Sequence, residues 1–506
     1  MPTRIASKPH LLAAALLAFY FLPLLLISRY DYPSGDDYRT LVRARQLGAA
    51  GAAAAWYTNW SGRYSSFFLQ SLIAARDSWL AAYRVVPVVL LVAGLACLYC
   101  FLRALLGAGL SRRATFTLAA VAYTLVVAVT PDISTGFYWL STNVQYAGAA
   151  FASLVVLALF IELGRASKAA TRAVIWLALV ALVALVAGLN ELSIIFLASA
   201  FASITASHFV RFRKLHAPGL ALLLVCVAFA AATFLAPGNF VRIRETKAEF
   251  HPAGIAAGSV GLTIYLIVEL LATTPLVPAG VLYLFFLHAN RGRLAAPLSL
   301  LAGVRWWWAL ASILCAVTLA NAALFAAVGV GANSLPFRVK NVYVYSIAPG
   351  WLFLLTVLFV DLSRRKFEFR LPAWAALALA SFVALFLLTG FELKLGGAPI
   401  PGAGPLQQAF SAVSTKSVCV NAYLDLLTGR ASRYRAQSEE RERALRGAAG
   451  GEVDFPLYSY APKTIFIQDA NHPYAAPEVM SEAVAGSAKR LRFVPTGPVM
   501  TQKEGF

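Results

Sequence analysis

The chain has 506 residues, of which 60% are hydrophobic and only 13% are charged. A soluble domain could not bury this much apolar surface, so the composition excludes a soluble protein and indicates a polytopic membrane protein. The formal net charge of +20 would also suit a nucleic-acid-binding protein, but most Lys and Arg residues lie in short loops between apolar runs, as the positive-inside rule requires. The predicted partner is therefore a membrane and not a nucleic acid.

The first apolar run follows a basic N-terminal stretch and has no small-residue cleavage site after it, which predicts an uncleaved signal anchor. Further runs are about 17 to 25 residues long, the length that crosses a bilayer. The run 257–289 could hold two helices, but we expect one tilted or broken span after an interfacial segment. The sequence thus predicts about eleven spans, near 11–28, 84–102, 114–130, 146–163, 173–189, 192–209, 219–236, within 258–289, 305–329, 343–361 and 371–391.

Basic loops alternate with non-basic loops along this series of spans. If the N-terminus is cytoplasmic, the basic loops all fall on the cytoplasmic side, as expected for a membrane protein. These loops are 103–113, 165–172, 211–216, 288–305 and 364–370. The Ala-rich stretch 49–55, in the first loop on the opposite side, is typical of an amphipathic helix on the membrane surface.

The composition changes after residue 391, which divides the chain into a transmembrane domain, 1–391, and a C-terminal domain, 392–506. Residues 392–506 are rich in charge, Gly and Pro, and contain no run long enough to span a bilayer. The periodicity predicts a helix near 409–446, which Gly429 could divide in two, and short strands such as 464–467. The predicted fold class is an all-α polytopic membrane protein with a small extracytoplasmic α/β domain.

Paired acids directly follow the first span, as Asp36 and Asp37 in the sequence SGDDY. Two adjacent carboxylates raise each other's pKa by repulsion, and one of them is then suited to accept a proton near neutral pH. A solvated loop after a membrane helix would have the same composition. We therefore take Asp36 and Asp37 as candidates for a catalytic base and keep the loop as the alternative.

Two later outer loops contain basic residues on the side where the topology disfavours them. Arg242 and Arg244 stand in GNFVRIRE, and Arg338 and Lys340 stand in LPFRVKN. In an extended loop the i, i+2 spacing would place each pair on one side, and such cations bind phosphate oxygens. Ordinary anchoring at lipid headgroups is the alternative.

Other polar residues of the outer loops are candidates for substrate binding. Asn190 and Glu191 lie at a tight turn between two spans, where an ionisable group is a functional hypothesis. A purely structural turn and an aromatic belt at the interface are the alternatives. The remaining candidates are Tyr138 and Asn143, with their neighbours Trp139 and Gln145, and Arg63 in WYTNWSGRYSS.

A signal-anchor span followed at once by a loop with paired acids, then many spans and an outer C-terminal domain, resembles the GT-C superfamily of membrane glycosyltransferases. Those enzymes take a sugar from a polyprenyl-phosphate carrier and pass it to an acceptor on the extracytoplasmic side. The segments FYWLSTNVQY and PGNFVRIR also resemble a group of bacterial polytopic proteins placed near that superfamily. The resemblance implies a multi-pass protein of the bacterial inner membrane, with a cytoplasmic N-terminus and a periplasmic C-terminal domain.

The resemblance also implies roles for the candidate residues. The first-loop acid of the family corresponds to Asp36 or Asp37, as general base or in orienting the acceptor, and cations of later outer loops hold the lipid phosphate. No cofactor is required, and the acids Asp31, Asp36, Asp37 and Glu191 leave room for a divalent metal without demanding one.

The resulting expectation is an inverting glycosyltransferase with a polyprenyl-phosphate sugar as donor and a glycan, lipid or protein as acceptor. One alternative is a flippase or transporter of lipid-linked sugars, which predicts polar residues near the bilayer midplane. Another is an O-antigen ligase or polymerase, in which the outer arginines dominate the chemistry and the first-loop acids are incidental.

Overall fold

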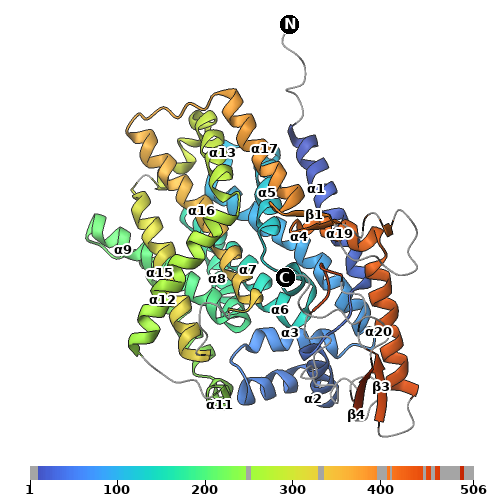
Figure 1. The fold of residues 1–506 in the computed structure, drawn as a ribbon. Helices are drawn as coiled ribbons and strands as arrows, with labels where there is room; N and C mark the ends of the chain where they lie inside the picture. The colour runs from blue at the N-terminus through green and yellow to red at the C-terminus, as the bar shows by residue number, and fades with distance from the viewer. Residues whose placement is uncertain are drawn as a thin grey trace.

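A computed structural model describes residues 9–246, 252–301, 303–328, 335–395, 413–447 and 452–456, with isolated residues and short pieces between 407 and 494. The described chain is almost entirely helical, and its strands form two sheets of two strands each (Figure 1). The expected all-α polytopic class is confirmed at this level.

Eight helical segments of the described chain are long and apolar enough to cross a membrane. They contain α4 (Trp79–Leu106), α7 (Ala149–Arg165), α8 (Ala169–Leu189), α9 (Glu191–Phe212), α10 (Ala217–Phe234), α12 (Pro252–Thr273), α15 (Trp306–Val328) and α16 (Phe337–Arg364). Three further helices coincide with other predicted spans: α1 (Pro9–Ile27), α5 (Arg112–Ala128) and α17 (Ala373–Thr389). Helix α13 (Leu276–Ala289) shares the one span predicted within 258–289 with α12. A count of eleven spans stays a prediction.

The long apolar run 257–289 is divided into α12 and α13 at Thr274 and Pro275. Proline has no backbone N–H to donate and its ring disfavours a continuing helix, but it is tolerated at a helix start. Pro275 accordingly precedes the first residue of α13.

The helices α2 (Asp36–Asn59), α3 (Tyr64–Ala74) and α11 (Pro237–Thr246) lie together at one end of the molecule, at the bottom of Figure 1. The helix expected at 49–55 is the second half of α2. Gly48, with φ of 68°, breaks the regular backbone between the two halves, and glycine tolerates this left-handed conformation best.

The predicted basic loops gather at the opposite end. Arg165 donates from Nη1 to the carbonyl oxygen of Ala104 at 2.7 Å, which joins the first two loops. Gly107 packs against Pro297, and Gly303 lies against the guanidinium of Arg211. These contacts bring four of the five loops together. The loop 288–305 contains the short helices α14 (Arg291–Leu294) and η6 (Pro297–Leu301).

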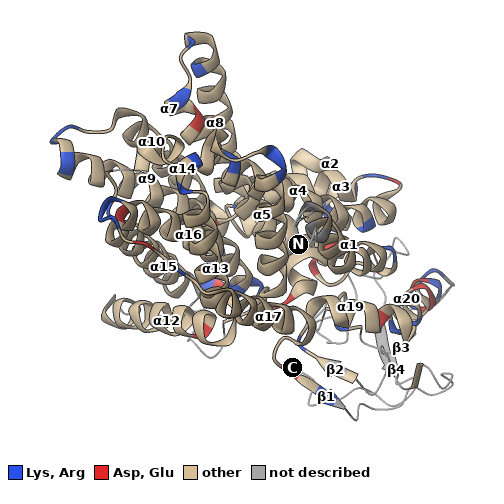
Figure 2. Cartoon of the chain, turned by 90° about the horizontal axis from the view of Figure 1, so that it is seen from above, with Lys and Arg blue, Asp and Glu red and all other residues tan. Residues whose placement is uncertain are grey.

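The spans therefore connect two chemically different ends. Helix α9 begins at Glu191 near α3 and ends at Phe212 beside Arg211, and α16 begins at Phe337 and ends at Arg364 in the last basic loop. Figure 2 shows Lys and Arg at the turns and on α20, while the spans themselves contain few charges.

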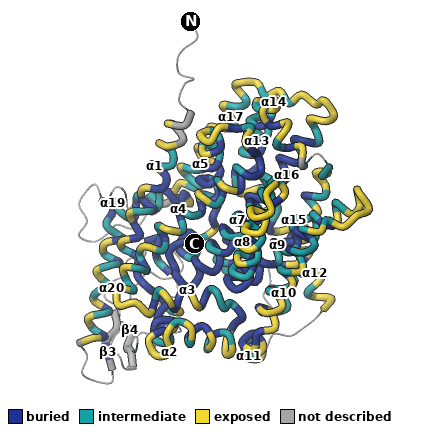
Figure 3. Tube along the Cα trace, turned by 180° about the vertical axis from the view of Figure 1, so that it is seen from behind, coloured by how far each residue is buried: buried dark blue, intermediate teal, exposed yellow. Residues whose placement is uncertain are grey.

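The outward faces of the spans are apolar. Val85, Val89 and Val92 follow one another on α4 at helical spacing and are all more than half exposed, and Leu177 of α8 is 73% exposed. Figure 3 shows such exposed positions along the outer helices. Apolar surface of this extent suits a lipid environment.

The segment 130–145, expected as an outer polar loop, is instead folded into short helical turns inside the protein. Two π-helical turns, Ser134–Tyr138 and Val144–Gly148, flank α6 (Leu140–Asn143). The turns are buried and held from α16, because Asn341 accepts from the backbone N–H of Asp132 at 3.1 Å and donates to its carbonyl oxygen at 2.8 Å. π-helical turns are rare and frequently occur at functional sites.

The C-terminal segment begins with two helices, α19 (Val418–Leu427) and α20 (Arg430–Gly447). Gly429 lies between them with φ of 73°, so the helix is divided at the place considered in the sequence. The helix predicted to run from near 409 is wrong at its start, because residues 413–415 form strand β2 and α19 begins only at Val418. Helix α19 packs on α1, where Tyr423 donates its hydroxyl to the carbonyl oxygen of Phe19 at 2.9 Å. The strands are β1 (Leu393–Leu395), antiparallel to β2 (Val413–Thr415), and β3 (Glu452–Pro456), parallel to β4 (Arg490–Val494).

The strand predicted at 464–467 is wrong, because these residues form a turn and an irregular segment. The Asp425 carboxylate accepts from the backbone N–H of Thr464 at 3.0 Å and from its hydroxyl at 2.8 Å. The backbone N–H of Thr464 thus donates to a side chain of α19, whereas in a strand it would have donated to a neighbouring strand. Whether 392–506 forms a separate α/β domain stays a prediction.

Candidate functional site

A cavity of about 1090 Å³ lies at the end formed by α2, α3 and α11. One part of its wall is polar and comes from α2, the turn before α3, the second π-helical turn and α11. The other part is apolar and includes the adjoining ends of α15 and α16, through Ala323, Leu324, Ala326 and Val339. The cavity can therefore receive a molecule with both polar and apolar parts.

Arginine is the main charged residue of this wall. Within the described residues the lining contains five arginines, Arg39, Arg43, Arg63, Arg242 and Arg338, and four acids, Asp36, Glu191, Glu245 and Glu482. Such a wall favours the binding of an anion, because guanidinium groups match phosphate and carboxylate oxygens in pairs.

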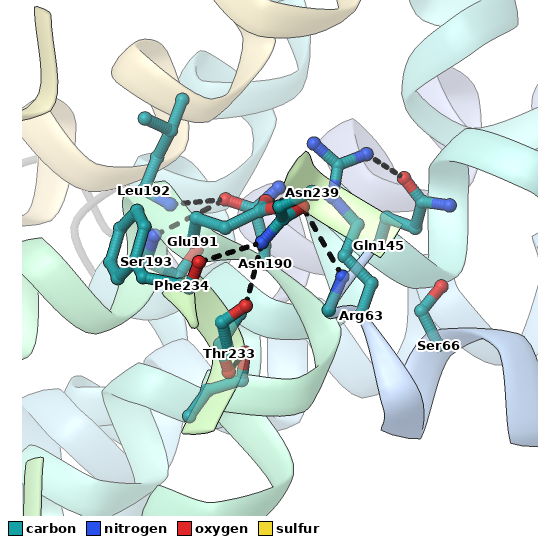
Figure 4. Close-up of polar contacts among 12 residues, drawn as sticks. Arg63, Ser66, Gln145, Asn190, Glu191, Leu192, Ser193, Thr233, Phe234 and Asn239 are labelled. Carbon is teal, nitrogen blue, oxygen red and sulfur yellow. Dashed lines mark hydrogen bonds and ion pairs between the residues drawn. The ribbon is translucent and has the colours of Figure 1, made fainter. Parts of the chain in front are cut away.

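Arg63, Glu191 and Gln145 form the centre of the polar wall (Figure 4). Arg63 donates from Nε to Oε2 of Glu191 and from Nη1 to Oε1 of Gln145, both at 2.7 Å. The side chains of Arg63 and Glu191 are only 20% and 10% exposed. The second oxygen of Glu191, Oε1, is buried with no hydrogen-bond donor, so a ligand hydroxyl could donate to it.

The position of Glu191 follows from the local sequence. Asn190 has an extended backbone and caps α9, because its Oδ1 accepts from the N–H groups of Leu192 at 2.9 Å and Ser193 at 3.2 Å. Asparagine is among the preferred N-cap residues, and the helix dipole favours a carboxylate in the first turn. The predicted tight turn is confirmed, and Asn190 holds Glu191 in the cavity wall.

The position of Arg63 depends on two glycines. A Cβ atom on Gly62 would lie 1.9 Å from the carbonyl oxygen of Thr233, and one on Gly238 would lie 2.4 Å from the backbone nitrogen of Trp60. Asn239 closes the same junction by donating to the Thr233 carbonyl at 2.7 Å. The turn before α3 and the start of α11 thus pack backbone to backbone, which fixes Arg63 opposite Glu191.

The paired acids of the first loop point in different directions. Asp36 lines the cavity with a side chain 57% exposed, and its Oδ1 lies 3.6 Å from Nη1 of Arg39. Asp37 is 3% exposed and does not line the cavity. Both begin α2, and successive residues of a helix are turned by about 100°, so neighbouring acids cannot share one side.

Asp37 is instead held by four hydrogen bonds. Its Oδ1 accepts from the backbone N–H of Ser141 at 2.9 Å and from the Ser141 hydroxyl at 2.6 Å. Its Oδ2 accepts from the N–H of Ser34 and the hydroxyl of Tyr83, both at 3.0 Å. Burial raises the pKa of Asp37 from 3.8 to about 6, although these hydrogen bonds oppose the shift. Asp37 fixes the start of α2 against the wall segment that contains Ser141.

The expectation that each basic pair lies on one side is wrong, because both pairs are helical and not extended. Residues i and i+2 of a helix point about 200° apart. Arg242 of α11 and Arg338 of α16 line the cavity, whereas Arg244 is exposed and does not. Lys340 points to α12, where its Nζ lies 3.1 Å from Oε1 of Glu269.

Tyr138 and Asn143 are buried away from the cavity lining. Tyr138 donates its hydroxyl to the carbonyl oxygen of Leu24 in α1, and Asn143 donates to that of Phe137, both at 2.7 Å. Their neighbours Trp139 and Gln145 do line the cavity. The guanidinium of Arg338 lies 5.8 Å from the centre of the Trp139 ring, within reach of a cation–π contact.

Several lining residues were missed by sequence reasoning, among them Arg39, Arg43 and Gln46, which line the cavity from α2 together with the predicted Asp36. Their spacing, i, i+3, i+7 and i+10, is that of one helix face, so a search for polar periodicity in the first outer loop could have found them. Asn239, which joins the turn before α3 to α11, has no such signal.

In the described chain, no group of three or more His, Cys, Asp or Glu side chains could hold a metal ion. Comparisons with family models, with curated proteins and with solved structures found no match to this chain. A function for this protein must therefore be inferred from the chemistry of its cavity.

Proposed function

We propose that this protein is a membrane glycosyltransferase that moves a sugar from a polyprenyl-phosphate donor to an acceptor hydroxyl. The observation that supports it is the shared cavity to which Asp36, Arg63, Glu191, Arg242 and Arg338 contribute from separate segments of the chain. An acid, an acid–guanidinium pair and further arginines are the groups that such a reaction needs.

In the proposed reaction the acceptor oxygen attacks the anomeric carbon of the sugar. The bond from that carbon to the phosphate oxygen breaks, polyprenyl phosphate leaves with the electron pair, and the configuration inverts. Asp36 accepts the proton of the acceptor hydroxyl, because it is the first-loop acid that lines the cavity. Asp37 is a positioning residue, since its oxygens accept from Ser34, Tyr83 and Ser141.

Negative charge grows on the departing phosphate, and fixed cations lower the energy of that transition state. Arg338 and Arg242 are the candidates for this role, because both line the cavity and Arg63 is already paired with Glu191. The apolar ends of α15 and α16 suit the isoprenoid part of a lipid donor, so the same cavity could take both halves of the molecule.

The distribution of basic loops supports a location for the reaction. Four of them lie together at the end away from the cavity, and basic loops face the cytoplasm in membrane proteins. The cavity would then open at the periplasmic face of a bacterial inner membrane, with the N-terminus in the cytoplasm and the C-terminal segment in the periplasm.

The test is transfer by the purified full-length protein from a polyprenyl-phosphate sugar to a set of hydroxyl acceptors. Asp36→Asn and Arg338→Gln should each lower the turnover number by at least about 100-fold, in line with the loss of a general base or of a transition-state cation. Arg76→Gln is the matched control, because Arg76 is exposed at the same end and does not line the cavity. Full activity of Asp36→Asn would refute the assignment of the base.

The large share of arginine in the wall favours one second candidate, a ligase or polymerase in which guanidinium groups act on the lipid phosphate and Asp36 is incidental. The half-exposed Asp36 in an ion pair with Arg39 is compatible with that role. Loss of transfer in Arg338→Gln and Arg242→Gln, with normal transfer in Asp36→Asn, would establish the second candidate.

A transporter predicts polar groups near the midplane, and the clearest of these is Asn321 of α15. Its Nδ2 donates to the hydroxyl of Thr263 at 3.0 Å, and its Oδ1 accepts from the hydroxyl of Tyr343 at 2.5 Å. These contacts join α12, α15 and α16. Asn321 thus serves helix packing and gives no support to a transport pathway.

A further inference from the structure

Arg43 is held in the cavity wall by aromatic side chains. Its guanidinium carbon lies 3.9 Å from the centre of the Trp56 ring. The Trp56 ring stacks on Phe67, with ring centres 4.8 Å apart and planes 12° from parallel. All three residues line the cavity. Because Trp56 contacts Arg43 and Phe67 through its ring, its free polar group is the indole N–H at the edge.

Polar atoms at this place are buried and have no hydrogen-bond partner among the residues that the structure describes. They are Nη1 of Arg43, Nε1 of Trp56 and Oγ of Ser61, and all three residues belong to the cavity wall. Trp56 is 6% and Ser61 is 1% exposed. Buried polar groups in folded proteins are almost always hydrogen-bonded. Arginine and tryptophan nitrogens can only donate, so what satisfies them must supply acceptor oxygens.

Among the described residues, Arg43 has no partner in an ion pair. Two of the acids in the wall already have other partners: Asp36 is paired with Arg39, and Glu482 accepts from Gln46 at 3.0 Å. Burial and the charge of Arg39 lower the pKa of Arg43. A cation held among donors and beside a second cation favours an anionic ligand.

This place is distinct from the proposed reaction centre. Arg43 lies seven residues after Asp36 on α2, which corresponds to about 10 Å along the helix. Arg338 lies near the start of α2, because it contacts Trp139, whose indole N–H donates to the carbonyl oxygen of Ser34 just before that helix. One phosphate bound at Arg338 could not also satisfy Arg43, so an oxyanion at Arg43 would be a second one.

We propose that Arg43 and the indole N–H of Trp56 form a second anion subsite, which binds a phosphate or carboxylate group of the acceptor. The assignment of the bound anion to an acceptor rests on the proposed transferase function, whereas the anion subsite itself can be tested without any transfer. It predicts that the acceptor class is an acidic glycan or a phosphorylated molecule and not a neutral sugar.

Binding is measured by calorimetry on the full-length protein in nanodiscs of phosphatidylcholine, with methyl phosphate, glucuronate and glucose as probes. The anions should bind and glucose should not. Arg43→Gln should weaken anion binding about tenfold or more, the usual effect of losing a hydrogen bond to a charged group. Trp56→Phe keeps the stacking and should weaken binding less, while Arg76→Gln should leave it unchanged.

Equal anion affinity in the wild type and Arg43→Gln would overturn the proposal. If Arg43→Gln does not fold, Arg43→Lys and Trp56→Phe replace it, because each keeps most of the side-chain volume and loses specific N–H donors; both should weaken anion binding. A lipid headgroup is the other source of an oxyanion. If nanodiscs with phosphatidylglycerol protect Arg43 from an arginine-modifying reagent and the soluble anions bind nowhere, the subsite belongs to a lipid and the acceptor proposal fails.

The two proposals fail in different ways. Arg338→Gln and Asp36→Asn should abolish transfer and leave the binding of methyl phosphate at Arg43 unchanged. Normal anion binding at Arg43 without any transfer would refute the proposed function alone. Transfer to neutral and acidic acceptors at equal KM, unaffected by Arg43→Gln, would refute only the second subsite.

Discussion

The guanidinium Nε of Arg63 lies 2.7 Å from Oε2 of Glu191, although 128 residues separate them in the chain. This ion pair joins the turn before α3 to the first residue of α9, and both side chains are largely buried. It sits in the wall of the cavity with Gln145, so it holds the outer helices to the spans at the place where chemistry is proposed.

Removal of one partner should leave a buried charge uncompensated. Arg63→Met and Glu191→Gln are each expected to lower the free energy of unfolding by about 3 to 5 kcal/mol, measured by detergent-induced unfolding of the purified protein. The double variant should lose less than the sum of the two. The exposed pair Arg370 and Glu368 is the control, since water screens it and its loss should leave the free energy of unfolding nearly unchanged. Additive losses at Arg63 and Glu191 would contradict the coupling.

The burial of Asp37 should give a defined pH dependence of stability. Its pKa is about 6 in the folded protein and 3.8 ordinarily, so the folded state binds a proton more tightly than the unfolded chain does. The contribution of Asp37 to stability is therefore fully present below about pH 4 and is lost as the pH rises through about 6. The neighbouring Asp31, whose pKa burial also raises, acts in the same direction.

The variant Ser141→Ala isolates the contribution of Asp37 to this pH dependence of stability. The Ser141 hydroxyl donates to the ionised carboxylate at 2.6 Å, so its removal should cost about 1.5 to 3 kcal/mol at pH 7 and raise the pKa of Asp37 further. At about pH 4.5, where Asp37 is protonated, the cost should be smaller. Ser432→Ala, at an exposed serine of α20, is the control. Equal costs at both pH values would show that Asp37 is not the titrating group.

The cap of α9 gives a further prediction. Asn190→Ala removes the acceptor for the N–H groups of Leu192 and Ser193 and should lower stability by about 1 kcal/mol. Asn190→Asp keeps an acceptor oxygen and should recover most of that loss. If the aspartate variant is as unstable as the alanine variant, the cap is not the role of Asn190. The free energy of unfolding in mild detergent distinguishes the outcomes.

Much of the fold could be predicted from hydropathy alone. Apolar runs of sufficient length located the eight helical segments of the described chain that could cross a membrane. The alternation of basic loops predicted which turns lie together, as the contacts of Arg165 with Ala104 and of Gly107 with Pro297 bear out. Gly429 correctly divided the C-terminal helix. These features depend on local composition, which a sequence states directly.

The candidate site was predicted in part, because its loops were treated as extended. Because α11 and α16 are helical, Arg242 and Arg338 line the cavity while Arg244 and Lys340 point away from it. Asp36 and Asp37 separate for the same reason. Long-range contacts, such as that of Arg63 with Glu191, depend on how helices pack and have no local signal in the sequence.

The close backbone packing beside Arg63 leads to the last prediction. In Gly62→Ala the new methyl group would lie 1.9 Å from the Thr233 carbonyl oxygen, so the turn must move away from α10. We expect a loss of about 1 to 3 kcal/mol in stability, as for overpacked sites, and a weaker Arg63–Glu191 coupling in the double-variant cycle. Gly164→Ala is the control, because a Cβ there meets nothing within 4 Å and alanine favours the helix by about 0.5 to 1 kcal/mol. A Gly62→Ala protein with unchanged stability and coupling would mean that the turn is not fixed by this contact.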